Sequence, residues 1–134
     1  MEKINVTVEI TENNYSAYIN LLPGCVAVGD NFEQLQNNIK SAVDEHVSIS
    51  REFGDTLPEI FNKDYELVFK FDATSLLQHY KGIFTMSALE RLTGINQRQL
   101  QRYASGESIP RKSQSDKIAR AFHKLGKELW IVSL

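Results

Sequence analysis

Residues 85–106, TMSALERLTGINQRQLQRYASG, contain two short helical patterns separated by a glycine. The first pattern places Leu89 on an apolar inner face. Gly94 then allows a tight turn, because glycine adopts a left-handed backbone conformation at no steric cost. We therefore predict helices over 86–93 and 97–104. The residues that complete the pattern are Thr85 and Asn96, each a good helix cap, and Ile95, an apolar plug between the helices.

The outward face of the second helix is polar and carries no acid, while Leu100 and Tyr103 occupy its inner face. Gln reads adenine and Arg reads guanine through paired hydrogen bonds in the major groove of DNA, and the first residues of a recognition helix reach the base edges. Such a face is also common on solvated helices, but the order helix, glycine turn, apolar plug, cap and helix favours DNA binding. The predicted base-reading residues are Gln97, Arg98, Gln101 and Arg102.

Charge divides the chain near residue 72. Residues 1–72 contain 13 Asp and Glu against 5 Lys and Arg, a net charge of −8, whereas residues 73–134 contain 4 against 10, a net charge of +6. A basic half suits phosphate, and an acidic half suits a basic protein. Arg111 and Lys112, which follow the second helix, are predicted to bind DNA phosphate. We expect two domains, 1–72 and 73–134, with different partners.

The acidic half begins with two alternating runs. Apolar and polar residues alternate from Ile4 to Thr11, which is the period of a half-buried strand. A second run with this period extends from Tyr15 to Leu21 after the turn residues Asn13-Asn14, so we predict a hairpin. Pro23-Gly24 ends the hairpin, and the short apolar run Cys25–Val28 is predicted as a third strand.

A long amphipathic helix is predicted next. Asp30 and Asn31 each precede a Glu or Gln by three residues, so either can begin the helix with a capping box. Apolar residues recur at three- and four-residue steps from Phe32 to Phe53, and Gly54 suits the C-terminal cap. Alternation returns from Tyr65 to Asp72 and predicts a fourth strand. The acidic half therefore has the order β-β-β-α-β.

The basic half is helical almost to its end, with helices predicted over 73–81, 86–93, 97–104 and 115–125. The last residues form an apolar tail that is either a strand or an extension of the last helix. We expect this tail to be buried inside the fold or against a second copy. One recognition helix reads only a few base pairs, so a homodimer or larger oligomer is expected. The predicted dimerisation residues are Leu129, Trp130, Ile131, Val132 and Leu134.

Few residues point to other chemistry. The single Cys25 excludes an internal disulfide and a zinc site built on several thiolates, and its place on a short strand favours sheet packing. His46, His79 and His123 are scattered and favour structural roles. No glycine-rich phosphate loop is present, and we expect no cofactor, metal or small-molecule substrate. Because the chain has neither a signal sequence nor a membrane-spanning apolar stretch, we expect a soluble cytoplasmic protein.

Residues 73–126 resemble a lambda-repressor/Xre-type helix-turn-helix. The resemblance rests on Leu89, the turn Gly94-Ile95-Asn96, and the helix from Gln97 to the closing Gly106. Where that family usually has a small alanine, Glu90 stands here. In that family the first two positions after the cap commonly contact bases, as does the position four residues after the second of them. This implies base contacts by Gln97, Arg98 and Arg102. The segment around the closing glycine commonly contacts phosphate, which implies Ser105, Arg111 and Lys112.

Residues 1–72 resemble the N-terminal domain of HicB antitoxins, a truncated ribonuclease-H-like sheet. The resemblance rests on Pro23 to Asp30 and on the following helix with Phe32, Leu35 and Ile39. Family members usually have Ser or Thr at Asn31, which caps helices equally well. The two resemblances imply an α+β protein, in which a partial ribonuclease-H-like β-β-β-α-β domain precedes an all-helical helix-turn-helix domain.

Together the resemblances imply a type II antitoxin. Such a protein binds and occludes a small basic HicA-type mRNA-cleaving toxin, and represses its own operon by binding double-stranded operator DNA. Toxin contacts are expected within residues 1–72, with Glu9, Glu12, Asp55 and Glu59 as candidates. The alternative is a stand-alone helix-turn-helix transcriptional regulator, whose N-terminal domain binds a ligand or dimerises.

A metal-dependent nuclease is the enzymatic alternative. A ribonuclease-H-like sheet would need several convergent carboxylates to hold magnesium. Glu9 is predicted on the outward face of the first strand, and Asp30 is better explained as a helix cap, so we expect no enzyme. The acids considered for such a site are Glu9, Glu12, Asp30, Glu66 and Asp72.

Overall fold

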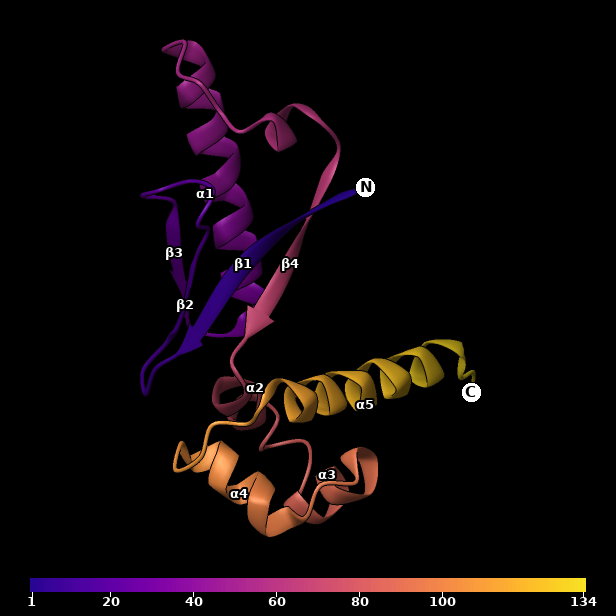
Figure 1. The fold of residues 1–134 in the computed structure, drawn as a ribbon. Helices are drawn as coiled ribbons and strands as arrows, with labels where there is room; N and C mark the ends of the chain where they lie inside the picture. Colours follow the sequence, from indigo (N-terminus) through magenta and orange to yellow (C-terminus); the bar gives the residue numbers. More distant parts are fainter. The chain divides into compact units, whose positions relative to one another are not determined.

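The computed structural model describes residues 1–134 and divides into two compact units, unit 1 (Met1–Asp72) and unit 2 (Ala73–Leu134) (Figure 1). The chain is an α+β protein with a four-stranded mixed sheet and five α-helices. Unit 1 contains β1 (Glu2–Ile10), β2 (Tyr15–Tyr18), β3 (Val26–Gly29), α1 (Phe32–Glu52), the 3-10 helix η1 (Glu59–Asn62) and β4 (Tyr65–Phe71). Unit 2 contains α2 (Ala73–His79), α3 (Met86–Thr93), α4 (Gln97–Ser105) and α5 (Lys112–Ile131).

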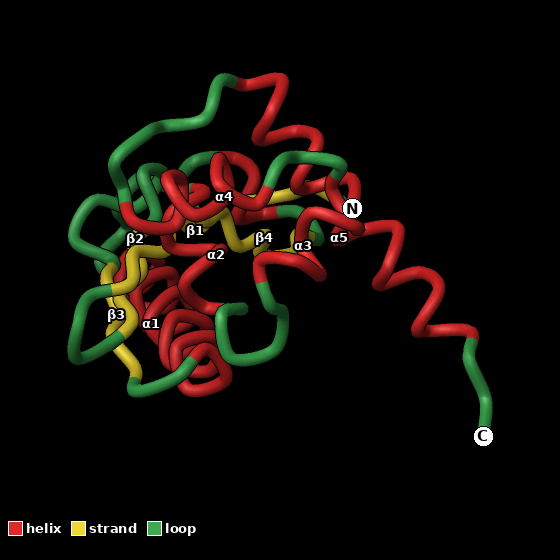
Figure 2. Tube along the Cα trace, turned by 90° about the horizontal axis from the view of Figure 1, so that it is seen from below, coloured by secondary structure: helices red, strands yellow, loops and turns green.

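The sheet of unit 1 has the strand order β3-β2-β1-β4. β1 pairs antiparallel with β2 and parallel with β4, and β2 pairs antiparallel with β3. The long connection through β2, β3 and α1 allows the parallel pairing. α1 runs along one face of this sheet (Figures 1 and 2). The order of strands and helix in unit 1 is the predicted one.

One face of the sheet forms the core of unit 1. Ile4, Val6 and Val8 alternate along β1, and all three are buried. They belong to one cluster with residues of α1 that recur every four positions, among them Leu35 and Ile39. Each element buries a single face, so its apolar period matches its own geometry.

The chain after β2 differs from the prediction. Alternation was expected to continue to Leu21, but β2 ends at Tyr18, and the Leu22 N–H donates to the Ile19 carbonyl oxygen at 3.1 Å. This turn breaks the alternation, so Leu22 is buried and Leu21 is 46% exposed. β3 likewise begins one residue after Cys25, which is buried just outside the strand.

Asn31 caps α1. Its Oδ1 accepts a hydrogen bond from the Gln34 N–H at 2.8 Å, whereas the Gln34 side-chain oxygen accepts one from the Asp30 N–H at 3.1 Å. The interpretation of Asp30 as the cap is therefore wrong. Asn31 has the extended backbone of a cap residue, while Asp30 is tied back to the helix only through its own N–H.

The end of β3 lies very close to the first turn of α1. A Cβ atom at Gly29 would come within 2.6 Å of the Leu35 backbone nitrogen, so a larger residue would force a backbone shift. Further along α1, Asn38 Nδ2 donates a hydrogen bond to the Val28 carbonyl oxygen at 2.8 Å. Since β3 is an edge strand, this bond occupies a backbone group of that edge.

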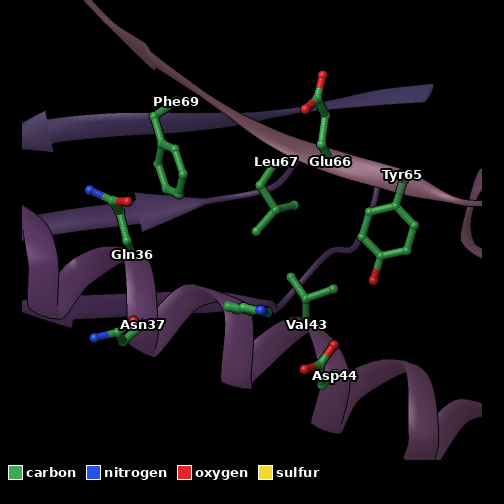
Figure 3. A pocket seen from close by; sticks show the side chains of 9 residues that line it. Gln36, Asn37, Val43, Asp44, Tyr65, Glu66, Leu67 and Phe69 are labelled. Carbon is green, nitrogen blue, oxygen red and sulfur yellow. The ribbon is translucent and has the colours of Figure 1, made fainter. Parts of the chain in front are cut away.

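α1 leaves part of β4 uncovered. A groove of about 580 Å³ lies between the two elements, with mostly apolar residues and Glu66 on the β4 side and mostly polar residues on the α1 side. Figure 3 shows Tyr65, Leu67 and Phe69 directed toward α1, whereas Glu66 points to the other side of the strand. The helical face of the sheet is therefore incompletely covered at this edge.

Unit 2 has a core of its own. Each of its four helices contributes one fully buried side chain, namely Leu77, Leu89, Leu100 and Ile118. The first three helices begin as predicted and end within two residues of the predicted positions. The last helix, predicted over 115–125 with the tail left open as a strand or its extension, starts at Lys112 and continues to Ile131. Gly126 lies inside this helix, where a single glycine costs only about 1 kcal/mol.

Candidate nucleic-acid interface

Caps on both helices define the turn between α3 and α4. Thr85 Oγ1 accepts a backbone hydrogen bond at 3.0 Å at the start of α3, and Asn96 Oδ1 accepts one at 2.8 Å at the start of α4. Gly94 ends α3 with a φ of +75°, in the left-handed region that favours glycine. Ile95 is buried in the core of unit 2. These four residues occupy the positions predicted for them.

Thr93 is a buried polar residue that sequence reasoning missed. Its hydroxyl donates to the Leu89 carbonyl oxygen at 2.7 Å and accepts from the Ile95 N–H at 3.1 Å. One side chain thus satisfies backbone groups on both sides of the turn. A threonine directly before the helix-ending glycine was the available signal, because Thr often bonds backbone groups nearby.

The other end of α4 is held by α2. Thr74 Oγ1 donates to the Tyr103 carbonyl oxygen at 2.7 Å, and Gln78 Nε2 donates to the Ala104 carbonyl oxygen at 3.0 Å. The last carbonyl groups of a helix have no partner within the helix. α2 supplies these partners and thereby fixes α4 at its C-terminal end.

α4 presents a polar face to solvent. Leu100, Tyr103 and Ala104 are buried, and the four predicted base-reading side chains on the opposite side are exposed. Because positions three and four apart lie on the same side of a helix, these side chains form one surface. That surface consists of Gln97, Arg98, Gln101 and Arg102.

Two acids contact this surface. Glu90 accepts two hydrogen bonds from Gln97, one from the backbone N–H at 3.3 Å and one from side-chain Nε2 at 3.2 Å. Glu107 Oε2 lies 3.6 Å from Arg102 Nε in an exposed ion pair. The side chain of Arg98, by contrast, has no hydrogen bond or ion pair within the chain. Glu90, the departure from the family pattern, therefore joins α3 to the start of α4.

The predicted phosphate contacts differ in their surroundings. Arg111 is the N-cap residue of α5 and Lys112 is its first residue, and both are exposed. The partial positive charge of a helix N-terminus adds to theirs. Lys112 Nζ lies 3.2 Å from Asp116 Oδ2. The Ser105 hydroxyl already donates to the Arg102 carbonyl oxygen at 3.1 Å.

The acidic candidates for protein contact do not form one patch. Glu9 lies on the sheet face opposite α1, and Glu12 lies in the hairpin turn. Asp55 and Glu59 lie in the connection from α1 to β4. Because β1 and β4 run parallel, that connection is near the start of β1 and the hairpin is at its end. All four side chains are exposed, at opposite ends of the sheet.

The apolar tail is helical through Ile131, which decides between the strand and the helix predicted for it. The exposed fractions are 60% for Leu129, 89% for Trp130 and 81% for Ile131, and Val132 and Leu134 are exposed as well. The expectation that the tail is buried inside the fold is therefore wrong. Burial against a second copy stays a prediction.

Cys25 and the three histidines lie outside this surface and differ in their exposure. Burial raises the pKa of the Cys25 thiol, which keeps it protonated and unreactive. Desolvation lowers the pKa of His79, whose ring lies edge-on to Tyr80 with centroids 4.7 Å apart. His46 is half-buried on α1, and His123 is exposed on α5.

The carboxylates considered for a nuclease do not converge. Nowhere in the chain do three His, Cys, Asp or Glu side chains lie close enough together to hold a metal ion. As a separate finding, none of the helices has the combination of length and continuous apolar sequence that crossing a bilayer requires.

A short stretch of the chain is similar to a known protein. No protein-family model matches the chain. A Helicobacter pylori (strain J99) protein described as a UPF0150 protein is 42% identical over 41 residues. The match covers 31% of this chain and 57% of that protein, so the chain spans little more than half the length of this relative.

Thr93→Val replaces the buried hydroxyl by a methyl group and leaves the Ile95 N–H without a partner. We expect the free energy of unfolding of unit 2 to fall by about 1–3 kcal/mol. Urea unfolding followed by circular dichroism measures this change. Ser87→Ala removes an exposed hydroxyl from the same helix and should change it by less than about 0.5 kcal/mol. Equal losses in both variants would contradict the role of Thr93.

Proposed function

We propose that the chain is a non-enzymatic antitoxin with two working parts. Unit 1 binds and occludes a small HicA-type mRNA-cleaving toxin, and unit 2 represses the chain's own operon by binding operator DNA. The similarity to the Helicobacter pylori protein supports the first part, because UPF0150 proteins are HicB-like. The observation that carries the second part is the exposed polar face of α4, which contributes no acid of its own and on which Arg98 has no internal partner.

In this proposal α3 and α4 form a helix-turn-helix, with α4 as the recognition helix. Arg98 keeps all its donors available, so it is the strongest candidate for paired hydrogen bonds to guanine. Glu90 holds the Gln97 amide in a defined position before DNA arrives. Arg102 must leave Glu107 to contact a base, which costs little because exposed ion pairs contribute about 0–1 kcal/mol.

Unit 1 is proposed as the toxin-binding part, with its sheet and α1 as a partial ribonuclease-H-like domain. Its net charge of −8 suits a partner that binds RNA and is therefore basic. Complementary charge accelerates association and disfavours acidic competitors.

The alternative is a stand-alone regulator, in which unit 1 binds a ligand or dimerises. The groove between α1 and β4 is the feature that favours it. The two functions differ in one requirement, because an antitoxin needs a toxin encoded by an adjacent gene.

The antitoxin proposal predicts that its two activities separate by mutation. Co-expression with the adjacent gene's product should restore growth, and an operon–reporter fusion should be repressed. Arg98→Ala should lose repression and keep neutralisation, because the residue lies in unit 2. Glu9→Lys combined with Glu12→Lys should weaken neutralisation and keep repression. The proposal fails if no product of an adjacent gene arrests growth, or if both variants lose both activities.

Two basic residues should differ in their effect on DNA binding. Arg98→Ala should cost about 1–3 kcal/mol on the operator and little on random DNA, because it removes a base contact. Lys112→Ala should weaken binding to both and reduce the salt dependence, because it removes a phosphate contact. Fluorescence anisotropy with operator and scrambled duplexes at several salt concentrations measures both. Equal losses on the two duplexes for Arg98→Ala would refute base reading.

We further propose that the tail of α5 contacts a second copy. Dimerisation would place two recognition helices on two half-sites, which useful specificity requires. The five exposed apolar side chains of the tail would then leave solvent.

Trp130, the only tryptophan, reports on this contact. Its emission should shift to shorter wavelength as the protein concentration rises, because the indole moves from water into an apolar interface. Ile131→Glu should abolish the shift, and Lys127→Glu, an exposed change one turn earlier, should leave it largely intact. Emission typical of exposed indole at every concentration would exclude the tail as an interface.

A further inference from the structure

β4 is an edge strand of the sheet, so some of its backbone N–H and C=O groups point away from the other strands. The Glu2 N–H donates to the Asp64 carbonyl oxygen at 3.2 Å, so Asp64 bonds toward β1. Successive residues of a strand direct their backbone groups to alternate sides. The N–H and C=O groups of Tyr65, Leu67 and Phe69 therefore point away from β1, out of the edge of the sheet.

The side chains of these three residues line the groove beside α1. They are only half-buried, although two of them are aromatic. Figure 3 shows the three side chains facing α1. A strand added beside β4 would place its own inward side chains in the groove and continue the sheet beneath α1.

The sequence of β4, YELVFKF, is complementary to itself when it is reversed about Val68. In an antiparallel pair centred there, Glu66 lies opposite the partner's Lys70, and the partner's Glu66 lies opposite Lys70. On the groove side Leu67 lies opposite the partner's Phe69. We propose that β4 pairs antiparallel with β4 of a second copy around a twofold axis at Val68, forming one continuous eight-stranded sheet.

The direction of the backbone groups fits this register. The backbone groups of Leu67 and the partner's Phe69 point toward each other, so these two residues form a hydrogen-bonded pair and exchange both N–H···O bonds. Two further pairings, Val68 with its copy and Glu66 with the partner's Lys70, are non-hydrogen-bonded pairs, in which Cα atoms are only about 4.5 Å apart. Side chains lie closest together in non-hydrogen-bonded pairs, so the opposite charges lie where they contribute most.

Charge favours a second copy over a basic partner at this edge. Unit 1 as a whole is acidic, but the edge itself carries Lys70 together with Glu66, and the groove carries Lys40 together with Asp44. A uniformly basic strand would place a cation opposite Lys70. Only a strand with the same charges in reverse order satisfies both positions. This inference does not depend on the proposed function and uses a different surface from the tail of α5.

Cross-linking through Val68→Cys tests the pairing in the full chain. Val68 is 36% exposed, and the Cα separation in a non-hydrogen-bonded pair lies in the range that a disulfide spans. Mild oxidation should give a covalent dimer on a non-reducing gel. Asn5→Cys is the matched control, because Asn5 lies beside Val68 on β1, and two copies of it would be about 14 Å apart across three strand spacings. Cys25 is buried and does not compete.

Charge reversal in the Val68→Cys background tests the register. Glu66→Lys alone and Lys70→Glu alone should each slow dimer formation about tenfold, because each creates like-charge pairs. Glu66→Lys with Lys70→Glu together should restore the original rate. Circular dichroism checks that each exposed change leaves the fold intact.

Three results would overturn the proposal. They are no covalent dimer of Val68→Cys, a double reversal as slow as the single ones, and equal cross-linking of Asn5→Cys. If the edge instead binds a basic protein, Glu66→Lys should weaken that binding and Lys70→Glu should strengthen it, with no covalent dimer.

Discussion

The orientation of α4 depends on side-chain hydrogen bonds at both of its ends. Thr93 joins the Leu89 carbonyl oxygen inside α3 to the Ile95 N–H beyond the turn, so the bend between the two helices is held by hydrogen bonds and by packing. Thr74 and Gln78 hold the far end of α4 in the same way. With both ends fixed, the polar side chains project from a rigid element. A binding surface gains affinity when its groups are positioned before the partner arrives.

The fold was predictable where one element buries one face. β1, β4 and α1 follow their apolar periods because each turns one face toward the core of unit 1. The prediction failed at Leu21, where a turn breaks the alternation and Leu22 takes the inward position. The sequence left the tail open between a strand and an extension of the last helix, because its exposed apolar residues have no clear amphipathic pattern. The start of α5 was predicted three residues too late. Local patterns therefore sufficed for elements in contact, and failed for turns and unpacked segments.

The candidate site was predictable in its outline. Caps and glycine turns are local, so Thr85, Gly94 and Asn96 could be assigned from spacing alone. The contacts from α2 to α4 join residues 26 and 29 positions apart, and no local pattern reports them. The acidic partners of Gln97 and Arg102 were missed for the same reason, because a charge on an exposed helix does not reveal which neighbour it meets.

The two edges of the sheet differ in one bond. At β3 the Asn38 amide donates a hydrogen bond to the Val28 carbonyl oxygen, whereas no side chain bonds to the outward backbone groups of Tyr65, Leu67 and Phe69 on β4. A sheet with two bare edges can add molecules at both ends and polymerise into a fibril. A pairing of β4 with β4 of a second copy would leave β3 as the outer edge of the combined sheet in both molecules. The Asn38 side chain therefore removes one of the backbone acceptors through which β3 could pair with a further strand, which disfavours growth of the sheet at that edge.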